Sequence, residues 1–134
     1  MTMFYLHFNQ ADNEIDWIRA GHDPALLYDP GEDRFQELGG AGLALGVDAD
    51  YPFSGRYRTT LERGQIFLIY TDGLWEACNS SSVPYGKERL KNCLRRHSHL
   101  NAYEIIQHIL DDQERFRNGA ANEDDITLVV IKFQ

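Results

Sequence analysis

Two acidic positions in this sequence lie next to its two most apolar β-like segments. Asp72 follows directly on residues 65–71 (QIFLIYT). Asp124 and its neighbour Asp125 come directly before residues 126–131 (ITLVVI). If the two segments pair as antiparallel strands of one sheet, the end of the first and the start of the second lie at the same edge. Because carboxylate oxygens are the hard ligands that Mg²⁺ and Mn²⁺ prefer, the arrangement predicts a divalent metal site with Asp72 and Asp124 as ligands.

Gly73 fits this interpretation, because a residue without a side chain lets backbone or a ligand approach closely. For either aspartate taken alone, a turn or capping role is the alternative, since Asp-Gly pairs are common in turns. Two such positions beside the two most apolar strands favour the metal site. Thr71 and Glu76 lie near Asp72 in the sequence, and we expect structural roles for both.

The elements that must position these aspartates form an α+β pattern. Apolar runs or alternations bounded by turn residues predict strands at 2–8, 14–20, 25–28 and 34–38, arranged as an antiparallel meander of hairpins, and a further weak strand at 57–60. The segments 65–71 and 126–133 predict two strongly buried strands, the first of them central in its sheet. Apolar periodicity predicts a short helix at 74–77 and two longer helices at 86–97 and 102–116, the last with Asn101 as its N-cap.

Composition excludes several classes of function. The net charge of −8 disfavours a nucleic-acid or anionic-membrane partner, because no basic surface could release enough counterions. No apolar run approaches the roughly 20 residues that span a bilayer, and no secretory signal is recognisable, so we expect one cytoplasmic domain. Cys78 and Cys93 are accordingly expected to be reduced thiols.

Five motifs occur in a fixed order across positions 19 to 133. They are RAGHDPALLYDP, GLALGV, GQIFLIYTDGLWEACN, YGKERL and NEDDITLVVIKF. Together they resemble the C-terminal part of the bacterial metal-dependent protein phosphatases, the type 2C-like (PPM) group that includes the stage II sporulation protein E and RsbU phosphatases. The resemblance implies an antiparallel β-sheet sandwich flanked by helices.

The same resemblance implies a serine/threonine phosphatase in which two Mn²⁺ or Mg²⁺ ions activate a water molecule. The metal ligands of the family fall on Asp72 and Asp124, with Asp125 at a more variable neighbouring position and Gly73 as supporting backbone. The substrate implied is a phosphorylated signalling protein, such as an anti-sigma-factor antagonist.

The sequence also departs from the family pattern. These phosphatases carry an earlier aspartate, followed by a Gly-His-Gly-type turn, that bridges both metals, and this sequence contains no such segment. His22 belongs to a later motif and is not carried over as a ligand. Residues 1–134 are therefore expected to be the C-terminal portion of a domain whose N-terminal part is missing and would be a partner.

Such a chain should bind metal weakly, show little activity alone and self-associate through exposed apolar edges. Two alternatives remain open: a non-catalytic interaction module that keeps the fold, and an unrelated α+β binding domain whose aspartates coincide by chance. Among the other polar residues, we expect His97 and His99 to cap a helix end. We expect Glu104 and the pair at 111–112 to lie on the solvated face of the last helix.

Overall fold

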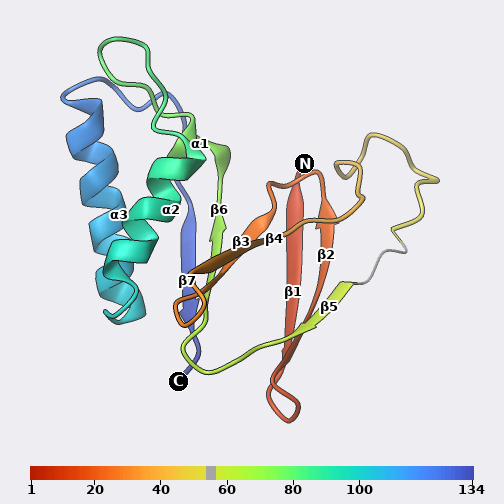
Figure 1. Cartoon of the computed structure of the whole chain (residues 1–134). Helices are drawn as coiled ribbons and strands as arrows, with labels where there is room; N and C mark the ends of the chain where they lie inside the picture. The colour runs from red at the N-terminus through yellow and green to blue at the C-terminus, as the bar shows by residue number, and fades with distance from the viewer. Residues whose placement is uncertain (54–56) are drawn as a thin grey trace.

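Two antiparallel sheets and a pair of helices form three layers in the computed structural model, which describes residues 1–53 and 57–134 (Figure 1). A four-stranded sheet of order β4-β3-β6-β7 is the middle layer, with the helices on one face and a three-stranded sheet of order β1-β2-β5 on the other. The strands are β1 Met3–Asn9, β2 Glu14–Ala20, β3 Ala25–Asp29, β4 Arg34–Leu38, β5 Tyr57–Thr60, β6 Ile66–Tyr70 and β7 Leu128–Lys132; the helices are α1 Asp72–Trp75, α2 Lys87–His97 and α3 Ala102–Arg117. This arrangement confirms the predicted α+β sandwich.

Alternate residues of β3 and β6 are buried on opposite faces of the middle sheet, which explains why both segments are continuously apolar. On the helix side, Leu26 and Leu68 belong to a fully buried cluster with the apolar stripes of α2 and α3. On the other side, Leu27 and Phe67 pack against Trp17 and other residues of the three-stranded sheet. The predicted central position of 65–71 is confirmed, since β6 lies between β3 and β7.

Two predictions about the strands were wrong. The hairpins β1–β2 and β3–β4 form as expected, but β2 pairs with β5 and not with β3, so the first four strands are no continuous meander. Residues 21–24 instead carry the chain from one sheet to the other. The segment 126–133 is also less buried than predicted, because β7 is an edge strand that pairs with β6, and Val129 is 43% exposed.

Helix α3 confirms its predicted cap and, at Glu104 and Asp111, its predicted solvated face, but not at Asp112. Asn101 and Glu104 form a reciprocal capping box, each side chain accepting from the backbone N–H of the other. Asp112, which was expected in solvent, is 7% exposed and accepts hydrogen bonds from Tyr85 at 2.9 Å and Arg89 at 2.9 Å. The charge of Asp112 therefore suggested the wrong environment, because Tyr85, in the loop before α2, and Arg89 of α2 both donate to its carboxylate.

Cys78 and Cys93 are free thiols, as predicted. Among the residues described, no helix is both long enough and apolar enough to cross a bilayer.

Candidate metal centre

The pairing of β6 with β7 brings the two predicted acidic positions to one edge of the middle sheet. The strands are antiparallel, with Tyr70 opposite Leu128, so the chain leaves β6 where it enters β7. Thr71 extends this contact beyond the strands. Its backbone N–H donates to the carbonyl of Thr127 at 3.1 Å, and its hydroxyl donates to the carbonyl of Asp125 at 3.2 Å while accepting from the N–H of Thr127 at 2.9 Å. Thr71 thus has the structural role predicted for it.

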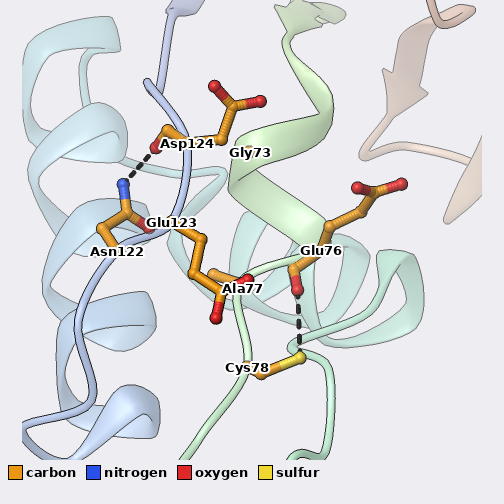
Figure 2. Close-up of a pocket in the computed structure, with 7 residues that line it drawn as sticks. All are labelled: Gly73, Glu76, Ala77, Cys78, Asn122, Glu123 and Asp124. Carbon is orange, nitrogen blue, oxygen red and sulfur yellow. Dashed lines mark hydrogen bonds between the residues drawn. The ribbon is translucent and has the colours of Figure 1, made fainter.

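Gly73 is required by a close approach of two backbone segments. A Cβ placed on Gly73 would lie 2.6 Å from the carbonyl oxygen of Asp125 and 3.3 Å from that of Asp124. Both neighbours are backbone atoms that no rotamer change can move away. Gly73, the residue after Asp72, is therefore packed against the backbone of Asp124 and Asp125 in the segment that leads into β7, and Figure 2 shows Gly73 beside Asp124.

The carboxylates themselves are exposed and locally anchored. The helix α1 begins two residues earlier than predicted, so Asp72 is its first residue, and one carboxylate oxygen accepts from the N–H of Gly73 at 3.0 Å. One oxygen of Asp124 accepts from the N–H of Asp125 at 2.8 Å, and the carbonyl of Asp124 accepts from the side-chain amide of Asn122. These short-range bonds restrict both side chains while leaving them open to solvent.

The two aspartates line neighbouring hollows. A cavity of about 320 Å³ is lined by Gly73, Glu76, Ala77, Cys78, Asn122, Glu123 and Asp124 (Figure 2). A smaller one of about 70 Å³ is lined by Thr2, Gly21, His22, Asp23, Thr71 and Asp72. Asp72 and Asp124 thus line separate hollows, and Gly73, which follows Asp72, lines the larger one with Asp124. Glu76 and Glu123 add negative charge to that larger cavity.

This donor set suits a hard divalent cation bound in part by water. Within residues 1–53 and 57–134, no group of three or more His, Cys, Asp or Glu side chains is arranged to hold a metal ion. Mg²⁺ is ordinarily held by one or two carboxylates and keeps several waters, so a pair of exposed aspartates fits that requirement.

The motif AGHDP, from which no metal ligand was expected, contributes residues to the site. His22 and Asp23 line the smaller hollow together with Asp72. The connection that carries them is fixed by a close approach, because a Cβ on Gly42 would collide with the carbonyl oxygen of Arg19, and the N–H of Gly21 donates to the carbonyl of Gly42 at 3.2 Å. The glycines at 21 and 42 indicate a tight connection in the sequence, but only the fold shows that this connection brings His22 and Asp23 next to Asp72.

Comparisons with known proteins agree with this geometry. The model of the family described as Stage II sporulation protein E (SpoIIE) matches residues 1–134. The phosphoserine phosphatase RsbU of Bacillus subtilis is 27% identical over 132 residues, which is 98% of this chain and 38% of RsbU. The SiaA-PP2C domain of Pseudomonas aeruginosa superposes with a TM-score of 0.83 at 20% identity, covering 98% of this chain and 51% of that domain.

A structure of the SpoIIE phosphatase domain of Bacillus subtilis presoaked with Mn matches with a TM-score of 0.70 at 18% identity, covering 98% of this chain and 56% of that one. The chain therefore has the fold of part of a PP2C domain. It spans about half or less of the length of each of these proteins.

Proposed function

The chain belongs to the Stage II sporulation protein E (SpoIIE) family, and we propose that it supplies the Asp72 and Asp124 side of the metal centre in a protein serine/threonine phosphatase. The substrate would be a phosphoserine or phosphothreonine on a bacterial signalling protein, such as an anti-sigma-factor antagonist. RsbU, a relative matched over nearly the whole chain, is named as a phosphoserine phosphatase. The remaining ligands of a complete centre would come from the part of the domain that precedes these motifs in longer family members.

One observation carries this proposal: the β6–β7 pairing places Gly73 in direct contact with the backbone of Asp124 and Asp125. Two aspartate-bearing segments from distant parts of the sequence thereby meet at one glycine. If the two aspartates served only as turn or capping residues, this contact between their segments would not be needed, because each aspartate could cap its own segment alone.

The roles of the residues follow from their positions. Asp72 and Asp124 would hold Mn²⁺ or Mg²⁺, which when bound lowers the pKa of a coordinated water and so supplies the nucleophile at neutral pH. Thr71 and Gly73 hold the two ligand-bearing segments together through backbone contacts. Asp125 donates its N–H to Asp124 and orients that carboxylate, while its own side chain is exposed.

Manganese titration of the 134-residue chain, followed by paramagnetic broadening of backbone amide signals, tests the proposal. We expect broadening centred on residues 71–74 and 123–126, at millimolar rather than micromolar Mn²⁺, because two carboxylates make an incomplete site. Asp72→Asn and Asp124→Asn should each abolish it. Asp111→Asn, which removes an exposed carboxylate on α3, is the matched control and should leave it unchanged.

The result also separates the proposal from its alternatives. Broadening that is spread over the acidic surface, or that survives both substitutions, would favour a non-catalytic interaction module. Micromolar binding at two sites would contradict the expected weakness of the isolated chain. Manganese-dependent hydrolysis of p-nitrophenyl phosphate, lost in Asp72→Asn, is the corresponding activity measurement, and we expect it to be low.

A further inference from the structure

A small cluster of side chains ties the β2–β3 connection to the helix that begins with Asp72. The carboxylate of Asp23 accepts from the indole N–H of Trp75 at 2.7 Å, and the same oxygen lies 3.1 Å from the ammonium group of Lys87. The ammonium group also lies 4.6 Å from the centre of the Trp75 ring. Three residues that are far apart in the sequence thus form one closed set of contacts.

The members of this cluster come from three segments: the β2–β3 connection, helix α1, which begins with Asp72, and the start of α2. Asp23 lines the hollow that Asp72 also lines. Trp75 is the last residue of α1, and Lys87 is the first residue of α2. The carbonyl of Trp75 accepts from the N–H of Gly86 at 2.9 Å, so the cluster also closes the base of the loop between the helices.

Helix α1 needs external support because it has four residues and a single turn is unstable by itself. Its own backbone contributes the bond from the N–H of Glu76 to the carbonyl of Asp72 at 2.9 Å. Of the side chains in the cluster, Asp23 is 27% exposed and Lys87 is 30% exposed, so their attraction is less screened than that of a surface pair. The cluster therefore adds a restraint on α1 from outside the helix.

We propose that Asp23 is a positioning residue of the metal centre: by holding Trp75 and Lys87, it fixes α1 and thereby the Asp72 carboxylate. This inference rests on the function proposed above, because it assumes that Asp72 binds the metal ion. Asp23 need not touch the ion or the substrate for this role. Its loss would let α1 shift without removing any ligand.

The test compares Mn²⁺ affinity, measured by amide broadening, in variants of the 134-residue chain. Asp23→Ala should weaken binding about 10-fold, the lower end of what loss of a supporting residue costs at metal sites. Asp23→Asn keeps an acceptor for Trp75 and should restore most of the affinity. In the same spectra, the Trp75 indole N–H signal should move in Asp23→Ala, while that of Trp17, which donates to the carbonyl of Gly39, should stay in place.

Asp33 offers a matched control in the other turn of β3. It accepts from the hydroxyl of Tyr28 at 3.0 Å and from Arg95 of α2 at 2.6 Å, so it too links an aromatic donor and a helix cation. Asp33→Ala should leave Mn²⁺ affinity unchanged. The inference is overturned if Asp23→Ala binds Mn²⁺ within twofold of the unsubstituted chain, or if Asp33→Ala weakens binding equally.

Two further measurements keep the conclusion clear. If Asp23→Ala does not fold, Trp75→Phe removes the indole donor but keeps a ring, and it should weaken Mn²⁺ binding by a smaller factor; unchanged binding in that variant overturns the inference. Asp72→Asn separates the two proposals, because unaltered binding in that variant refutes the metal centre itself. Loss of binding in Asp72→Asn with full binding in Asp23→Ala refutes only the positioning role.

Discussion

Substitution of Gly73 by alanine tests the contact on which the candidate centre depends. The new methyl group would lie 2.6 Å from the carbonyl oxygen of Asp125. Carbon–oxygen contacts are ordinarily about 3.3 Å or longer, so the segment that precedes β7 would have to withdraw by about 0.7 Å. Overpacking costs about 1–3 kcal/mol, and backbone neighbours place this case at the upper end. Alanine recovers at most about 1 kcal/mol through helix propensity, so the net loss should be about 1–2 kcal/mol.

The effect on metal binding should exceed the effect on stability. Metal sites tolerate ligand displacements of only about 0.2 Å, so a shift of the Asp124 backbone should remove most of the Mn²⁺ affinity from a chain that is still folded. Urea unfolding measures the loss of stability, and amide broadening by Mn²⁺ measures the loss of metal affinity.

Gly39→Ala is the control, because its Cβ would lie 3.9 Å from Pro24, an ordinary contact. That variant should stay within about 0.5 kcal/mol of the unsubstituted chain. The reasoning is refuted if Gly73→Ala unfolds at the same urea concentration and binds Mn²⁺ as well as the unsubstituted chain.

Further predictions concern the helices. Asp112→Asn should lower the free energy of unfolding by about 1.5–3 kcal/mol, measured by urea unfolding, because it weakens charge-assisted bonds from Arg89 and Tyr85. Desolvation raises the pKa of Asp112, but its bonds from Arg89 and Tyr85 outweigh it and hold the pKa below the ordinary 3.8. This contribution is complete above pH 3.8 and is lost as the pH falls through the lower folded value, so acid unfolding should show a shallower pH dependence in Asp112→Asn. Asn101→Ala should cost about 1 kcal/mol in thermal unfolding.

Local sequence patterns predicted the elements well, because each depends on neighbouring residues. Alternation of apolar side chains located the strands, and Asn101 marked the start of α3 correctly. Which strands pair with one another was harder to predict from the sequence. The pattern of β2 is the same whether its neighbour is β3 or β5, and the chain crosses between sheets at residues 21–24, where only glycine packing against Ala44 and Gly42 reveals the turn.

The residues of the candidate site likewise differ in how far the sequence predicts them. Asp72 and Asp124 could be proposed as ligands from the sequence because each adjoins a strand that is recognisable by its apolar residues. The further assumption that these two strands pair placed both aspartates at one edge of the sheet. Asp23 could not, because its role depends on an indole and an ammonium group that reach it from residues 52 and 64 positions further along the chain. Asp112 shows the converse: a carboxylate on a charged helix looks solvated until a tyrosine from another segment reaches it. The candidate ligands can thus be predicted from the sequence because they adjoin recognisable strands. The residues that position those ligands can be identified only from the tertiary packing.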